Sequence, residues 1–148
     1  MPAVVREKVM EVPKSALFKV ITDFEKYPEF VDEVVSVEIL PGATPTKKQV
    51  KFELEVIKRF DYVLEFDIKG QEEVAWRLVS SNIFKKNEGK WVLKEEGAGK
   101  TGVTYSLDIG LGFLVPGWVS KKLTETNLPK MLDGFESRAK KVTEASKS

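Results

Sequence analysis

The chain has 148 residues, 42% of them apolar, and contains neither cysteine nor histidine. This length fits one domain, and we expect residues 1–148 to form a single folded unit. The missing residue types exclude disulfides, thiol catalysis, serine–histidine relays and zinc sites built on these ligands. Any general acid or base must therefore be Asp, Glu, Lys or Tyr.

The charges are balanced, with 24 Lys and Arg against 23 Asp and Glu. A nucleic-acid-binding domain usually has a clear basic excess, so the composition disfavours that function. Lysine pairs at 47–48, 85–86, 121–122 and 140–141 are typical of solvated surfaces. The first eight residues are charged where a signal peptide is apolar, and no apolar run approaches the ~20 residues of a membrane span. We therefore expect a cytoplasmic protein.

The first thirty-one residues indicate one strand and two helical segments. Residues 4–12 mix β-branched and charged side chains, which is typical of a strand, and Pro13 ends it. Residues 15–25 carry an apolar face at spacings of three and four, which predicts a helix. Pro28 favours an extended Tyr27, so we expect a break and then a short second helical turn.

Beyond these segments the apolar period changes to two. Alternating apolar and polar side chains are the pattern of an antiparallel sheet with one solvated face. Six such segments cover residues 35–39, 50–56, 62–68, 74–78, 91–93 and 103–109, with turns predicted at 69–70, 87–89 and 97–102. Because no helix interrupts them, a meander is favoured over a βαβ fold.

The last third returns to a helical period. Apolar residues recur mostly at three or four from Val119 to Val142, which predicts a helix of about thirty residues after Pro116, kinked at Pro129. Such a helix needs a large apolar partner, and the apolar sheet face is the available one. We therefore predict an α+β fold in which a curved antiparallel sheet of six to seven strands grips the C-terminal helix. Two small helices lie between its first and second strands.

Two patterns resemble catalytic motifs. Residues 97–102 match G-x-G-x-x-G, but the following residues alternate as a strand instead of opening a helix, so a glycine-rich hairpin is favoured over phosphate binding. The carboxylates of Glu53, Glu55, Glu65 and Asp67 lie on the polar phase, where pairing with lysines is favoured over catalysis. Glu95 is in phase with inward residues, and its orientation stays open.

Aromatic residues dominate the inward phase of the sheet. Pattern alone does not distinguish a solid core from a ligand cavity, which is usually apolar with a few polar groups. The candidate cavity residues are Phe52, Tyr62, Phe66, Trp76, Trp91 and Tyr105 on the sheet, with Thr124, Asn127 and Met131 on or beside the facing side of the helix.

An uncharged segment, residues 109–119, joins the last strand to the helix. We predict a cavity mouth there, at Leu111, Phe113, Leu114 and Trp118, with transient membrane contact as a possible role. The alternative is a buried connection.

The order of elements resembles the START-like (Bet v 1-like, SRPBCC) superfamily with its helix-grip fold. Residues 17–31, LFKVITDFEKYPEFV, resemble the "Asp, then Tyr-Pro-x-Phe" segment of the polyketide cyclase/dehydrase and lipid transport family. That group includes coenzyme Q-binding proteins and the ribosome-association toxin. Residues 89–91 and 100–105 resemble its later strands. Coenzyme Q-binding members usually continue with a Pro-Trp-Cys-like run, whereas this chain has Asp32-Glu33-Val34, which disfavours ubiquinone as the ligand.

The resemblance implies a hydrophobic cavity, with catalysis in only some members. The leading hypothesis is binding or transport of a hydrophobic small molecule such as a lipid, a quinone or a polyketide-like compound, with no catalytic residue, metal or cofactor assigned. A cyclase or dehydratase needs a titratable group in the cavity, for which Tyr62, Tyr105 and Glu95 are the candidates. A ribosome- or protein-binding module needs the lysine pairs on one side. The oligomeric state stays open.

Overall fold

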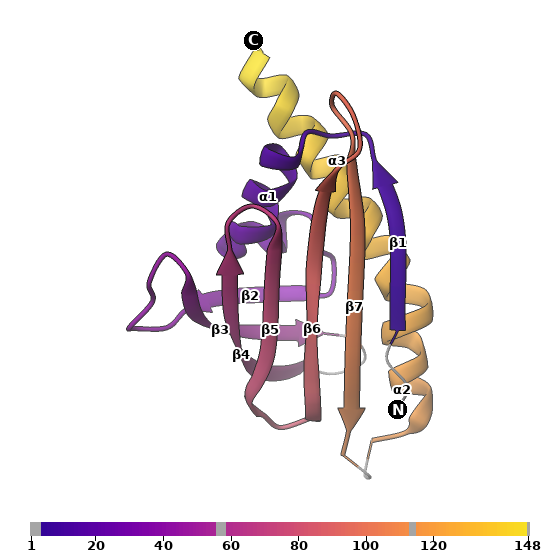
Figure 1. The fold of residues 1–148 in the computed structure, drawn as a ribbon. Coiled ribbons are helices and arrows are strands. Elements are labelled where there is room, and N and C mark those ends of the chain that lie inside the picture. The colour runs from indigo at the N-terminus through magenta and orange to yellow at the C-terminus, as the bar shows by residue number, and fades with distance from the viewer. Residues whose placement is uncertain (1–3, 56–58, 113–114, 148) are drawn as a thin grey trace.

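The computed structural model describes residues 4–55, 59–112 and 115–147 (Figure 1). One antiparallel sheet has the strand order β1-β7-β6-β5-β4-β3-β2. Its strands are β1 Val4–Met10, β2 Val34–Ile39, β3 Lys47–Glu55, β4 Arg59–Lys69, β5 Glu73–Ser81, β6 Phe84–Glu95 and β7 Thr101–Leu111. The helices are α1 Lys14–Thr22, the 3-10 helix η1 Phe24–Glu29, α2 Gly117–Lys121, the π-helix η2 Lys122–Asn127 and α3 Leu128–Lys147.

The predicted helix-grip architecture is confirmed. Strands β2 and β3 run crosswise to β6 and β7 in Figure 1, so the sheet is strongly curved, and the helical run from α2 to α3 lies along its concave side. The buried residues of α3 are Leu128, Leu132, Phe135 and Ala139, spaced four, three and four apart. This spacing places them on one helix face, which packs on the inward side of the sheet.

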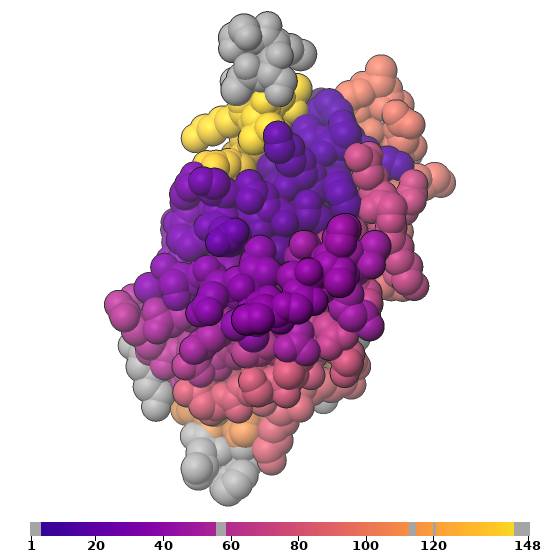
Figure 2. Space-filling model, turned by 90° about the vertical axis from the view of Figure 1, so that its left-hand side faces the viewer, coloured from indigo at the N-terminus to yellow at the C-terminus, as the bar shows by residue number. Residues whose placement is uncertain are grey.

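The N-terminal helices close the upper end of the structure. In Figure 2, α1 (indigo) lies beside the C-terminal end of α3 (yellow). Leu17, Val20 and Ile21 form the buried face of α1, as the spacing predicts. The predicted extended conformation of Tyr27 is wrong, because Tyr27 lies inside η1. Its buried hydroxyl donates a hydrogen bond to the Ile21 carbonyl, and this tertiary contact outweighs the local effect of the following proline.

The predicted turn at residues 87–89 is also wrong, since β6 continues through it. The chain turns earlier, between β5 and β6, where the Ser81 hydroxyl oxygen accepts the N–H groups of Ile83 and Phe84. Asn87 and Gly89 serve packing instead. The Asn87 side chain accepts the indole N–H of Trp76 at 3.1 Å, and Gly89 lies opposite Trp76 where a side chain has no space.

One other boundary differs from the sequence pattern. β1 ends at Met10, and the Val12 carbonyl instead accepts the Thr101 hydroxyl at 2.7 Å. Residue 56, predicted within a strand, lies outside the described residues. The glycine-rich segment is a hairpin between β6 and β7 as predicted, with positive φ at Gly97 and Gly99.

The helix kink predicted at Pro129 stays a prediction, while the structure has the π-helix η2 immediately before α3, in which Pro129 is the second residue. Proline lacks an N–H, and its ring crowds the carbonyl four residues earlier. A wider turn accommodates both effects, and such π segments are frequent at functional sites. No helix in the described part of the chain is long and apolar enough to cross a membrane.

The outer face of the sheet is held by ion pairs. Glu65 on β4 is flanked by Lys47 at 3.4 Å and Arg77 at 3.2 Å, as the lysine-pairing hypothesis predicted. One lysine of each predicted pair contacts a carboxylate, through Lys47, Lys86, Lys121 and Lys140. These contacts reduce the net positive charge at each lysine pair.

Acid sensitivity should follow from this arrangement. The hydrogen bond from Gln49 lowers the pKa of Glu65 from 4.5; burial opposes this shift, and Lys47 and Arg77 reinforce it. A lowered carboxyl pKa in the folded state stabilises the fold above the ordinary value, and that contribution is lost as pH falls through the folded-state pKa. Unfolding free energy measured in urea from pH 7 to about pH 3 should therefore fall less steeply for Glu65→Gln. Glu95→Gln is the control, because it removes an exposed carboxylate at the end of β6. Equal slopes for both variants would contradict this account.

Candidate functional site

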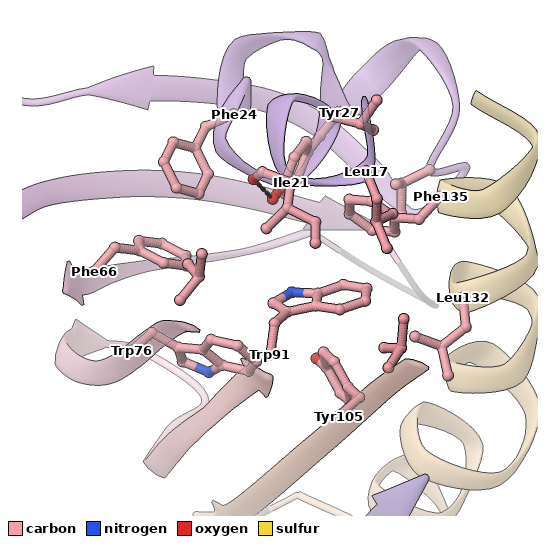
Figure 3. Close-up of a cluster of buried hydrophobic side chains, with 14 of the residues drawn as sticks. Leu17, Ile21, Phe24, Tyr27, Phe66, Trp76, Trp91, Tyr105, Leu132 and Phe135 are labelled. Atoms are coloured by element: carbon pink, nitrogen blue, oxygen red, sulfur yellow. Dashed lines mark hydrogen bonds between the residues drawn. The ribbon is translucent and has the colours of Figure 1, made fainter. Parts of the chain in front are cut away.

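A cavity of about 160 Å³ lies between the inward sheet face and the helical run. Figure 3 shows part of its wall, with Trp91 and Tyr105 from the sheet facing Phe135 of α3. The described residues that line it are Tyr27, Val31, Glu33, Val34, Phe52, Leu54, Tyr62, Leu64, Phe66, Trp76, Phe84, Asn87, Trp91, Tyr105, Leu107, Ile109, Leu123, Asn127, Leu128, Met131 and Phe135. Most of these side chains are aliphatic or aromatic, so the interior favours apolar ligands.

Most of the predicted cavity residues come together in this wall. The predicted residues that line it are Phe52, Tyr62, Phe66, Trp76, Trp91, Tyr105, Asn127 and Met131. Thr124 is buried on η2 but is not part of the lining.

The predicted mouth is not part of the wall where the structure describes it. Leu111 ends β7 and Trp118 lies in α2, and neither lines the cavity. Phe113 and Leu114 lie outside the described residues. Trp118 is 51% exposed, which is compatible with the predicted membrane contact. That contact stays a prediction.

Ring contacts fix the aromatic wall. Phe52 and Tyr62 stack with centroids 5.4 Å apart across β3 and β4. Trp91 meets Tyr105 edge-on at 4.8 Å across β6 and β7, and meets Phe135 of α3 at 5.0 Å. These separations are in the favourable range for aromatic pairs, so the rings hold one another in place and keep the cavity's shape.

The polar groups of the wall fall into two sets. The first set is already paired within the protein: the Trp76 indole N–H donates to Asn87, and the Tyr27 hydroxyl donates to the Ile21 carbonyl. Buried polar groups are normally satisfied in this way.

The second set has no partner among the described residues. The Asn127 side-chain nitrogen Nδ2 is buried without a hydrogen bond. The hydroxyls of Tyr62 and Tyr105 also make no hydrogen bond to a described residue. Burial raises the pKa of both phenols, and the nearby Tyr62 raises that of Tyr105 further, so both remain protonated near neutral pH and present O–H donors.

Glu33, just before β2, is the one charged side chain among the described cavity residues. The sequence pattern did not assign Glu33 to the site, because it precedes the alternating segment predicted at residues 35–39. Glu95 is exposed at the end of β6, which removes it from the candidate acids and bases of the cavity. Within the described ranges, no group of carboxylates is arranged to hold a metal ion.

A family described as polyketide cyclase / dehydrase and lipid transport matches residues 10–136. The chain belongs to this family. The predicted recognition of the START-like superfamily is thereby confirmed, while the coenzyme Q-binding branch stays a prediction. No curated protein matches the chain.

Solved structures of other proteins share the fold. The Zhui aromatase/cyclase from Streptomyces sp. R1128 superposes with a TM-score of 0.87 at 16% identity, covering 98% of this chain and 97% of its own. A START superfamily protein from Mycobacterium smegmatis gives 0.82 at 20% identity, covering 95% and 98%. A STAR-related lipid transfer protein from Xanthomonas axonopodis gives 0.76 at 19% identity, covering 93% and 85%. At these identities the likeness establishes the fold of this family member. It does not identify the ligand.

Proposed function

We propose that this family member binds or carries a compact hydrophobic small molecule in the cavity between sheet and helix. The observation that carries the proposal is the cavity itself, about 160 Å³ in volume and walled by stacked aromatic and aliphatic side chains. Transfer of an apolar ligand from water into this cavity is favourable by roughly 25 cal/mol for each Å² of apolar surface that is buried. The family's description as lipid transport, and the aromatase/cyclase and lipid transfer proteins of the same fold, support this class of function.

The volume limits the size of the ligand. An engineered apolar cavity of about 150 Å³ holds one benzene molecule. A cavity of about 160 Å³ therefore accommodates one ring with a short substituent. A long acyl chain or a several-ring compound needs the helical run to move outward. Of the lipid, quinone and polyketide-like ligands considered from the sequence, we favour the smallest ring compounds.

Blocking the cavity tests this function. Met131 of α3 lines the cavity and is only partly buried, so a larger side chain can fill the space without displacing the core. In NMR titrations with ethylbenzene, we expect the parent chain to bind with a Kd on the order of 0.1–1 mM. We expect Met131→Trp to bind at least tenfold more weakly. The matched control Lys130→Trp places the same bulk on an exposed neighbouring position outside the cavity and should bind like the parent. Equal binding by both variants would place the ligand elsewhere and contradict the proposal.

A second candidate, proton-transfer catalysis, is favoured by one observation. The Glu33 carboxylate and the phenols of Tyr62 and Tyr105 belong to the same cavity wall. A carboxylate base with O–H donors to a carbonyl oxygen is suited to removing a proton from the carbon beside a ketone. This alternative predicts that the chain accelerates deuterium exchange at the methyl carbon of acetophenone, a ketone that fits the cavity, and that Glu33→Gln abolishes the acceleration. If the chain binds the ketone but its deuterium exchange is no faster than in buffer alone, the carrier function stands and this reaction is excluded.

A further inference from the structure

We propose that the cavity selects uncharged ligands bearing a hydrogen-bond acceptor oxygen, such as a small ketone or lactone, over hydrocarbons and carboxylates of the same shape. The inference rests on the proposed binding function and specifies the chemistry of the ligand. It is carried by the unpaired donors of the cavity wall and by the charges around them.

The donors come from both sides of the cavity. Tyr62 and Tyr105 bring phenolic O–H groups from β4 and β7, and Asn127 brings its Nδ2 from η2 on the helical side. Asn127 Nδ2 is fully buried and makes no hydrogen bond with the described part of the chain. Because Asn127 lines the cavity, a rotation of its side chain that turns Nδ2 toward a bound ligand would pair this donor with an acceptor oxygen.

The two tyrosine donors are held in place before a ligand arrives. Tyr62 is stacked on Phe52. The Tyr105 ring packs between those of Trp76 and Trp91, with centroid separations of 5.4 and 4.8 Å. A ligand therefore loses little binding energy to ordering these rings. The contrast with Tyr27 is informative, because its hydroxyl in the same wall is already bonded to the Ile21 carbonyl and is not available to a ligand in this way.

The charges disfavour an anionic ligand. None of the described residues that line the cavity is Lys or Arg, and the one charged lining residue is the acidic Glu33. A carboxylate transferred from water into this cavity would lose its hydration without gaining a cationic partner. A neutral carbonyl oxygen accepts the same O–H and N–H groups at a much smaller desolvation cost.

A hydrocarbon fails for the opposite reason. It fills the space but leaves the donors unpaired, and sites built to hydrogen-bond a ligand discriminate strongly against analogues that lack the bonding group. The expected order of affinity is therefore ketone first, hydrocarbon second and carboxylate last.

Three ligands of similar shape test this order: acetophenone, ethylbenzene and benzoate, titrated at pH 7 by NMR. We expect acetophenone to bind at least tenfold more tightly than ethylbenzene, and benzoate to bind at least tenfold more weakly than acetophenone. Equal binding of acetophenone and ethylbenzene would overturn the inference and leave the proposed function standing. Tightest binding by benzoate would overturn it through the charge argument. Binding of none of the three would overturn the proposed function as well.

Single-atom variants connect the selectivity to the donors. Tyr62→Phe and Tyr105→Phe remove only the hydroxyls and should each lower the acetophenone-to-ethylbenzene preference at least threefold. Lys130→Trp is the control, since Lys130 is exposed and lies outside the cavity lining, and it should keep the preference of the parent chain. An unchanged preference in both tyrosine variants would contradict the assignment.

A variant at Asn127 keeps the inference testable if a tyrosine variant proves unstable. Asn127→Leu removes the buried unpaired Nδ2, so we expect its Tm to rise and its preference for acetophenone to fall. An unchanged preference in this variant would exclude Asn127 from ligand recognition and overturn that part of the inference.

Discussion

Phe135→Ala is expected to lower the free energy of unfolding by about 3–5 kcal/mol. Phe135 is 2% exposed on α3, and its ring meets those of Tyr27, Phe30 and Trp91 edge-on at 5.2, 5.0 and 5.0 Å. It therefore joins the C-terminal helix to both η1 and the sheet. Truncation removes these contacts and leaves a void continuous with the cavity it lines.

Urea unfolding with the slope checked for constancy measures this loss. Phe18→Ala is the control, since Phe18 on α1 is only partly buried and should cost clearly less. Because the enlarged cavity accepts an apolar ring, saturating ethylbenzene should recover part of the stability of Phe135→Ala through mass action. A loss below about 1 kcal/mol would show that this ring does not hold the helix against the sheet.

Gly89→Ala is expected to destabilise the chain by about 2–4 kcal/mol, although it adds a single methyl group. A Cβ at this position in β6 would lie 2.1 Å from the Ser106 carbonyl oxygen and 2.8 Å from Cζ2 of Trp76. The first obstacle is backbone of the neighbouring strand β7, so the sheet itself has to shift.

Gly110→Ala is the matched control for this substitution. It lies in β7 of the same sheet, and its added Cβ would meet the Lys86 side chain at an ordinary 3.5 Å. Its effect on the unfolding free energy should stay within about 1 kcal/mol. Similar losses in both variants would indicate a general intolerance of alanine in this sheet and contradict the packing role of Gly89.

The fold was predictable because its signals are periodic. The change of apolar period from helical to two and back to helical predicted the helices, the meander and the long C-terminal helix. The failure at residues 87–89 occurred because the partner of these residues lies on another strand. Asn87 and Gly89 favour a turn by local preference, but both face Trp76 of β5. The Trp76 indole N–H donates to the Asn87 side chain, and the Trp76 ring fills the space beside Gly89.

The site was predictable in its composition and not in its volume. Inward phase identified wall residues such as Phe52 and Trp91, whereas a void of about 160 Å³ depends on how every facing side chain packs. The unpaired Asn127 nitrogen has the same origin, because its lack of a partner is a property of the assembled wall. Glu33 could not be placed by strand phase, because it lies just before β2, where the alternating pattern has not yet begun.

The most direct test of the account is to locate a bound ligand. We expect intermolecular NOEs between the ring protons of acetophenone and the side chains of Phe52, Trp91 and Tyr105, all of which line the cavity. These NOEs should disappear in Met131→Trp and persist in Lys130→Trp. NOEs confined to the exposed Trp118, or the same cavity NOEs in Met131→Trp, would contradict the claim that this chain binds its ligand between the sheet and the helix.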